Sequence, residues 1–147
     1  MPSLGERLQA ALNEARKSRD QARTLLFSTI LADLKNREIQ LRHTPTDEEA
    51  VEVVRRGVKQ RREAVEAYEA AGRPDRAATE KAEITALEVF LPPGAGAEEI
   101  RAAVRAAIAA GAKDLGKVMG QVMPHLKGRA DGKMINQIAR EELSTAV

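Results

Sequence analysis

Five consecutive residues, Pro92-Pro93-Gly94-Ala95-Gly96, exclude both a helix and a strand from one place in the chain. Each proline lacks the backbone donor that regular structure needs, and the glycines favour irregular conformations. No regular element can therefore cross this segment of the 147-residue chain. We expect an N-terminal helical domain over residues 1–91, a linker over 92–96 and a C-terminal domain over 97–147.

Before this segment, apolar residues recur at helical spacing, and helix start and stop signals separate them into four stretches. Four residues can cap a helix N-terminus ahead of an apolar stripe: Ser3, Asp20, Thr46 and Asp75. Glu6 and Glu49 follow Ser3 and Thr46 at the spacing of a capping box. Gly72, followed closely by Pro74, is a typical stop for the third helix. The sequence therefore predicts about four helices in this part.

After the segment, three shorter apolar stripes predict three short helices. The first ends at Gly111, the second reaches Pro124, and Asp131 can cap the third. Hydrophobic residues make up 43% of the chain and aromatic residues only 2%, so Ala, Leu, Val and Ile must form the core. This composition favours helices over sheets. The expected fold is all-α, with a body of about four helices followed by a three-helix unit.

Several classes of site lack their residues in this sequence. The chain has no cysteine, so a disulfide, a thiolate metal site and a cysteine nucleophile are excluded. Neither His43 nor His125 has a second histidine at helical ligand spacing. No apolar run approaches the roughly 18 residues of a membrane span, and the first residues lack a signal-peptide apolar region. We expect a cytoplasmic protein without a metal, a cofactor or a catalytic residue.

The formal net charge of +2 conceals a segregation of charge along the chain. The first 91 residues are neutral overall, whereas residues 101–140 contain eight Lys and Arg against two Asp, a net charge of +6. A local positive field of this kind suits a polyanionic partner.

The stretch Lys127 to Lys133 resembles a phosphate loop at first sight, but it does not match a Walker motif. Three residues separate Gly128 from Gly132 where four are required, and Met134 follows in place of Ser or Thr. Gly128 can instead end one helix while Asp131 caps the next. Lys127, Arg129 and Lys133 then oppose the dipole of that helix N-terminus, so we expect a phosphate to meet their side chains. A merely solvated basic loop is the alternative.

Gly116 and Gly120 stand four residues apart on the preceding helix, and each costs roughly 1 kcal/mol relative to Ala. A close approach should offset this cost. We favour a neighbouring helix as the approaching object, and the alternative is an RNA backbone near Lys113 and Lys117.

Two other basic runs have different interpretations. The first is a run of five cations: Arg55, Arg56, Lys59, Arg61 and Arg62. Three of them stand four residues from an acid, namely Glu52, Glu63 or Glu66, which favours pairing along one helix. A cluster at the first interhelical turn has fewer acids nearby, and we treat it as a secondary candidate for RNA contact: Arg16, Lys17, Arg19 and Arg23.

The aromatic shortage limits the kind of RNA. Only Phe27, Tyr68 and Phe90 are aromatic, and all three lie on expected packing faces. Recognition by base stacking is therefore unsupported, which favours a folded RNA read through phosphates, 2′-hydroxyls and shape.

Two C-terminal stretches, residues 115–120 and 123–133, resemble the GatB/YqeY family, and upstream stretches at 35–39, 59–64 and 68–73 agree with it. The family shares this helical region with the tail of the GatB subunit of glutamine-dependent tRNA amidotransferase. The resemblance implies that the backbone of tRNA meets four basic side chains, Lys117, Lys127, Arg129 and Lys133. It also implies that four glycines shape the surface: Gly116, Gly120, Gly128 and Gly132.

The residues for amide transfer are not present, because the chain matches neither the amidase subunit nor the catalytic body of GatB. The resemblance therefore implies a tRNA-binding accessory module that is inactive alone, although a carbon–nitrogen ligase label could attach to it by inheritance. Amidotransferase subunits are candidate partners, and neither DNA nor a membrane is expected. The alternative is a helical protein–protein adaptor without an RNA partner.

Overall fold

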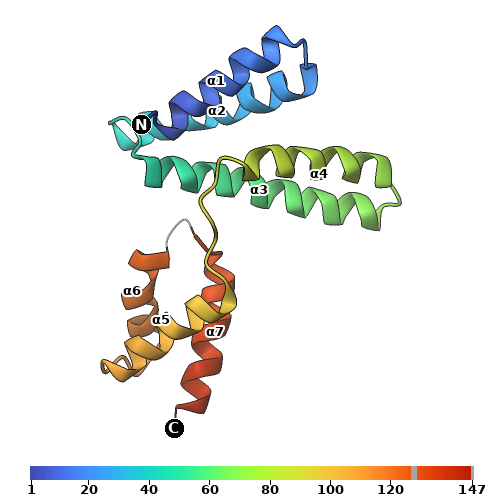
Figure 1. Cartoon of the computed structure of the whole chain (residues 1–147). Helices are drawn as coiled ribbons and strands as arrows, with labels where there is room; N and C mark the ends of the chain where they lie inside the picture. The colour runs from blue at the N-terminus through green and yellow to red at the C-terminus, as the bar shows by residue number, and fades with distance from the viewer. Residues whose placement is uncertain (127–128, 147) are drawn as a thin grey trace. The chain divides into compact units, whose positions relative to one another are not determined.

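The computed structural model describes residues 1–126 and 129–146, and within these residues it contains seven helices and no strand (Figure 1). The prediction of an all-helical fold is confirmed. The chain divides into two compact units, residues 1–91 and 92–147. Each unit has its own apolar core.

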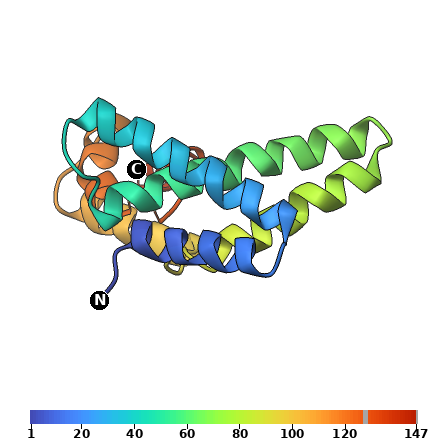
Figure 2. The ribbon, with the colours of Figure 1, turned by 90° about the horizontal axis from the view of Figure 1, so that it is seen from above.

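The N-terminal unit consists of two helical hairpins. Its helices are α1 (Leu4–Lys17), α2 (Gln21–Leu41), α3 (Asp47–Ala70) and α4 (Pro74–Glu88). Helices α1 and α2 pair in one hairpin and α3 and α4 in the other, as Figures 1 and 2 show. The hairpins pack together chiefly through α2 and α1 against α3. Leu8, Ile30, Val54 and Leu87 are fully buried where they meet.

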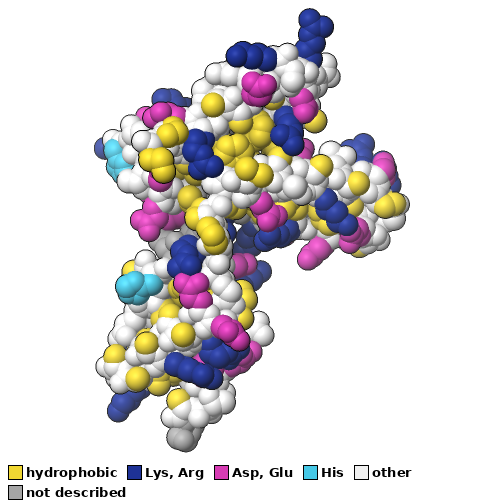
Figure 3. All heavy atoms as spheres, viewed as in Figure 1, with side chains coloured by type: hydrophobic (Ala, Val, Ile, Leu, Met, Phe, Trp, Pro, Cys, Tyr) yellow, Lys and Arg dark blue, Asp and Glu magenta, His cyan; other side chains and the backbone are white. Residues whose placement is uncertain are grey.

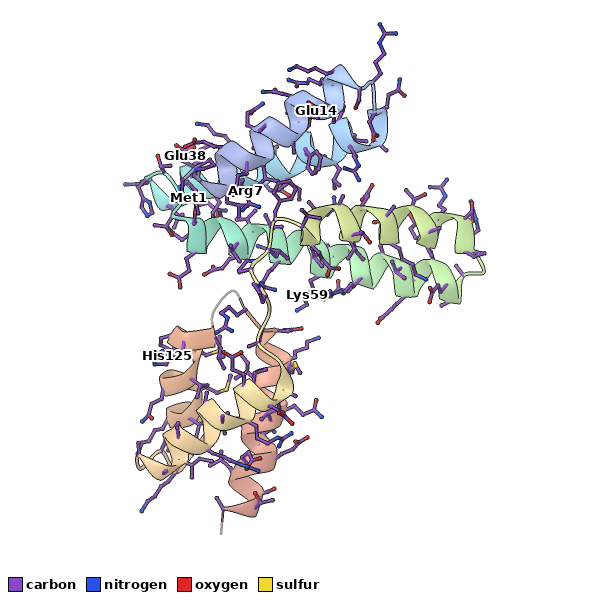
Figure 4. All side chains as sticks on the ribbon, in the orientation of Figure 1. Met1, Arg7, Glu14, Glu38, Lys59 and His125 are labelled. Carbon is purple, nitrogen blue, oxygen red and sulfur yellow. The ribbon has the colours of Figure 1, made fainter. Side chains whose placement is uncertain are left out.

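The two phenylalanines close this core. The rings of Phe27 and Phe90 meet edge to face with their centroids 5.6 Å apart. The guanidinium of Arg7, labelled on α1 in Figure 4, lies 5.4 Å from the centroid of the Phe90 ring. Phe90 follows the last turn of α4, so these contacts fix the end of the N-terminal unit to its first helix.

Most of the predicted helix ends are confirmed. The side chains of Ser3, Asp20 and Thr46 each accept a backbone hydrogen bond at the start of their helices. Gly72 has a φ of 71°, the left-handed conformation that ends a helix without a Cβ penalty. The prediction for α4 is wrong, because Arg73 occupies the cap position and Asp75 lies within the first turn. Proline favours the first helical position, and Pro74 therefore moves the helix start ahead of Asp75.

Gly57 lies at a close contact between the two hairpins. It is buried on α3, and a Cβ at this position would lie 3.0 Å from Cδ1 of Ile30 on α2. The same Cβ would lie 3.4 Å from Nη1 of Arg61. Arg61 is itself held in place, because it donates to the carbonyl of Gly57 and to the carboxylate of Glu83 on α4. The absence of a side chain at residue 57 thus lets α2, α3 and α4 meet.

Gly57→Val should lower the free energy of unfolding by about 1–3 kcal/mol, the usual cost of overpacking a core. Its methyl groups would displace both Ile30 and the Arg61–Glu83 pair. Chemical denaturation followed by circular dichroism measures the change. The matched control is Gly5→Val on α1, where the nearest atom to an added Cβ is Oγ of Ser3 at 3.9 Å. Equal losses for the two variants would contradict a close contact at Gly57.

The C-terminal unit contains α5 (Ala97–Ala109), α6 (Leu115–Leu126) and α7 (Gly132–Thr145). All three helices contact one another. Ile100, Val104, Val118 and Ile135 are fully buried among them. Helix α6 runs through Pro124 to Leu126, two residues beyond the predicted end.

The chain joins this unit before α5 begins. Ala95 is buried in the C-terminal core, and its backbone N–H donates to the carbonyl of Arg129 at 2.7 Å. The expected linker therefore contributes one residue to the packing of the C-terminal unit.

Candidate nucleic-acid interface

The net positive charge of residues 101–140 is partly neutralised by two acids that follow this range. Glu142 on α7 accepts from Nη1 of Arg101 at 2.8 Å and from Nε of Arg105 at 3.0 Å. Arg101 also lies 3.5 Å from Glu141. Both arginines belong to α5, so the cluster joins α5 to α7. Arg101 and Arg105 therefore have a structural role that the charge pattern alone did not indicate.

These contacts change the acidity of Glu142, whose side chain is only 10% exposed. Hydrogen bonds from Arg105 and from Arg101 lower the pKa of Glu142, although burial opposes them. A carboxylate with a lowered pKa stabilises the fold above the ordinary Glu pKa of about 4.3. This contribution is lost as the pH falls through the lowered value.

Glu142→Gln should lower the Tm of the C-terminal unit at pH 7 and should flatten its dependence on pH below about 4.3. The amide resembles the protonated acid and leaves the two arginines without their counter-charge. Thermal unfolding at several pH values between 3 and 7 measures both effects. The control is Glu63→Gln, since Glu63 is exposed and makes no ion pair within the described residues. If both variants keep the pH profile of the unchanged protein, the Glu142 cluster does not stabilise the unit.

Arg129, one of the predicted RNA contacts, is engaged within the protein. Its Nη2 lies 2.8 Å from a carboxylate oxygen of Glu99, in the first turn of α5. Its backbone carbonyl accepts from Ala95, and its N–H donates to Leu126. Arg129 therefore connects the segment before α7 to the start of α5, and its side chain is 38% exposed for any other contact.

Lys113 and Lys117 lie at the start of α6. The carboxylate of Asp114 accepts from the backbone N–H of Lys117 at 2.8 Å, which is the bond of a helix cap. The Lys117 ammonium lies 3.9 Å from the same carboxylate, with 70% of its side chain exposed. Lys113 is exposed, and within residues 1–126 and 129–146 no acid pairs with it. Both ammonium groups can thus reach an external anion.

Lys133 lies at the other end of this region, in the first turn of α7. Asp131 caps α7 as predicted, accepting from the N–H of Lys133 at 3.1 Å. The Lys133 side chain is exposed and has no ion pair with any described residue. The remaining two predictions for this loop, Lys127 and Gly128, lie outside the described residues.

The glycines of α6 do not pack against a neighbouring helix of their unit, which was the favoured explanation for their cost in helix stability. Apart from the backbone of α6 and the adjacent residues, no described atom of the C-terminal unit lies within 4 Å of a Cβ built on Gly120, and only the Asp114 carboxylate, at 3.4 Å, approaches one built on Gly116. Neither α5 nor α7 therefore packs on these two residues. Gly120 and Gly116 are exposed on one side of α6, together with Pro124, four residues further along. Gly132 on α7 is equally open.

The predicted contacts form two groups that α6 separates. Lys113 and Lys117 lie at its first turn, whereas Arg129 and Lys133 follow its last turn. At a rise of about 1.5 Å per residue, the ten residues from Lys117 to the end of α6 cover about 15 Å. Along the chain, the second of the exposed glycines of α6 therefore lies between the two groups. His125, labelled at the loop end of α6 in Figure 4, is exposed there as well.

Two arginines of the basic run on α3 pair with a neighbouring helix and not along their own. Arg61 and Arg62 contact α4, at 2.8 Å from Glu83 and 3.7 Å from Glu88. These pairs join the two helices of the hairpin. Their role is therefore structural, although the partners differ from the predicted ones.

Comparison of the sequence with known protein families identifies the family of this chain. The sequence pattern that defines the Yqey-like proteins matches residues 5–143, which include both units and all the predicted contacts. The chain belongs to the Yqey-like protein family. The C-terminal motifs that pointed to it, residues 115–120 and 123–133, lie on α6 and in the segment leading to α7.

The chain is similar to Altered inheritance of mitochondria protein 41, mitochondrial, of Eremothecium gossypii. The two sequences are 31% identical over 98 residues, which cover 65% of this chain and 54% of the relative. This Yqey-like chain thus spans about half the length of that protein. Because the relative is named as mitochondrial, the cytoplasmic location remains a prediction. Within the described part of the chain, no helix has the length and apolar character to cross a membrane.

Proposed function

We propose that this Yqey-like protein is an RNA-binding module that holds folded tRNA on the α6 side of its C-terminal unit. The observation that carries the proposal is the open glycine face of α6. Gly116 and Gly120 reduce the stability of their helix, and neither α5 nor α7 packs against them. A surface without side chains allows an RNA backbone to approach closely, and exposed lysines lie at the start of α6 (Lys113 and Lys117) and in the first turn of α7 (Lys133).

The remaining exposed groups favour recognition of phosphates and shape. Phe27 is 3% exposed, and Phe90 is half-buried against it, so neither offers a free ring face. Base stacking therefore contributes little, and the lysines supply a contact that does not depend on sequence. A folded RNA fits this combination better than a single strand.

The choice of tRNA rests on the resemblance of the α6 and α7 motifs to the tail of GatB. In this proposal the chain assists a reaction and does not perform one. Within the described residues, no three histidine or acidic side chains gather as metal ligands, and the buried Glu142 is held by two arginines. Assembly with amidotransferase subunits is a further part of the proposal.

A second candidate function, a protein–protein adaptor, is favoured by the outer side of α2. Leu25 and Ile39 are 70% and 65% exposed, two helical heptads apart, with exposed Ala32 between them. An apolar stripe on a solvent-facing helix is typical of a surface that meets another helix. This candidate predicts no affinity for RNA.

Titration of fluorescent folded tRNA with the intact protein separates the two candidates. We expect saturable binding whose affinity falls steeply between 50 and 200 mM salt, because phosphate contacts release counterions. A duplex DNA of equal length is the comparison, and it should bind more weakly. Absence of salt-dependent tRNA binding would remove the proposal and favour the adaptor.

A further inference from the structure

A second group of cations stands at the turn between α1 and α2, on the N-terminal unit. We call it the hairpin-tip cluster, and it consists of Arg16, Lys17, Arg19 and Arg23. All four are exposed, and Lys and Arg side chains project from this end of the hairpin in Figure 3. Arg23 lies 3.6 Å from Asp20. The other three have no ion pair with any residue that the structure describes.

Local structure explains only part of this cluster. Arg16 and Lys17 occupy the last turn of α1, where a positive charge interacts favourably with the helix dipole. Arg19 lies beyond the helix and gains nothing comparable. The helix dipole therefore explains Arg16 and Lys17, but it does not explain Arg19.

Arg19 has a left-handed backbone conformation, which is unusual for a residue with a side chain. Its φ is 58°, and its N–H donates to Arg16 while the next N–H, of Asp20, donates to Ala15. This is the helix-ending motif in which glycine is the usual left-handed residue. The chain does use glycine in this conformation at Gly72 and Gly111. At residue 19 it carries an arginine instead, in a backbone conformation that a side chain destabilises.

We propose that the hairpin-tip cluster is a second phosphate-binding surface, and that it contacts the same folded RNA as the C-terminal unit. This inference rests on the proposed function. Three of the four cations are arginines, whose planar fork suits phosphate oxygens. Residues 16–24 contain no large apolar side chain, so insertion into a lipid surface is not favoured.

Arg19→Gly tests the residue that stability does not explain. The variant should raise the Tm by a few degrees, because it removes the left-handed strain. It should also weaken binding of folded tRNA by roughly fivefold at 0.1 M salt, the loss of one phosphate contact. Arg42→Gly is the matched control, since Arg42 has a φ of 62° and ends α2 outside the cluster. That variant should gain stability and keep its affinity for tRNA.

A triple variant extends the test to the whole cluster. Arg16→Gln, Lys17→Gln and Arg19→Gly together should lower the slope of log K against log salt by about 2–3. The control removes the same charge from the α3–α4 hairpin, near the turn that joins its two helices. There Arg73 pairs with Asp75 and Lys81 with Glu69. Its three substitutions are Arg73→Gln, Arg76→Gln and Lys81→Gln.

The outcomes distinguish this inference from the proposed function. If the unchanged protein binds tRNA and the tip variants match their controls, the tip is not a contact, while the function stands. If the unchanged protein does not bind tRNA, both fail. Binding to vesicles that contain anionic lipid, or to an acidic protein, that depends on the cluster while tRNA affinity is unaltered would also overturn the inference.

Discussion

Replacing Lys113, Lys117 and Lys133 with glutamine should weaken the binding of folded tRNA by roughly 100-fold at 0.1 M salt. Each lysine that meets a phosphate contributes about 0.7–0.9 to the slope of log K against log salt, so the slope should fall by about 2–3. The three side chains are exposed, two at the start of α6 and Lys133 in the first turn of α7. Their loss should be felt equally with different tRNA sequences, because phosphate contacts carry no sequence information.

Fluorescence anisotropy with several purified tRNAs across a range of salt concentrations measures this effect, and circular dichroism checks the fold. The variant with Arg73, Arg76 and Lys81 replaced by glutamine removes the same charge elsewhere and should keep both affinity and slope. If the lysine variant also keeps them, the interface does not lie on α6 and α7.

Gly120→Leu should make the protein slightly more stable and should weaken its binding of folded tRNA. Leucine favours a helix more than glycine by roughly 0.8 kcal/mol, and no side chain of the described C-terminal unit lies within 4 Å of the new Cβ. The variant should therefore be slightly more stable. Its side chain would fill the surface that we assign to the RNA backbone and should weaken tRNA binding by at least about tenfold, equivalent to one or two phosphate contacts.

Gly5→Leu on α1 is the matched control, because Gly5 is also helical and the nearest atom to its Cβ position, Oγ of Ser3, lies at an ordinary contact distance of 3.9 Å. It should not change tRNA affinity. Thermal unfolding and tRNA titration are measured on the same protein samples. Unchanged binding by Gly120→Leu would mean that the glycine face is not part of the interface.

The helices could be predicted from sequence because their signals are local. Ser3, Thr46 and Asp131 each precede an apolar stripe, and each caps its helix in the structure. The start of α4 was predicted wrongly, because two local signals competed within two residues. The fixed φ of Pro74 favoured the first helical position, and the capping ability of Asp75 was not used.

The candidate interface was less predictable because its charges are partnered over long separations. Arg101 and Glu142 are 41 residues apart, and Arg129 and Glu99 are 30 residues apart. Nothing in their local sequence indicates these pairs, which depend on how α5, α6 and α7 pack. The composition of residues 101–140 therefore overestimated the positive charge available to a partner.

The role of the glycines of α6 could also be predicted only in part. Their spacing indicated that something must approach, but the sequence could not say whether the approaching object belonged to the chain. Gly57, which no local sequence signal marks, is the glycine that a neighbouring helix contacts. Gly116 and Gly120 are exposed instead.

The burial of Ala95 determines where the chain can be cut. A C-terminal fragment that begins at Ala97, the first residue of α5, would lack both the buried Ala95 methyl and its hydrogen bond to Arg129. The carbonyl of Arg129 would lose its donor in the segment that leads to Lys133. A fragment that begins at Pro92 keeps these contacts. Isolated C-terminal fragments for binding or NMR work should therefore start at residue 92, although the helix itself starts five residues later.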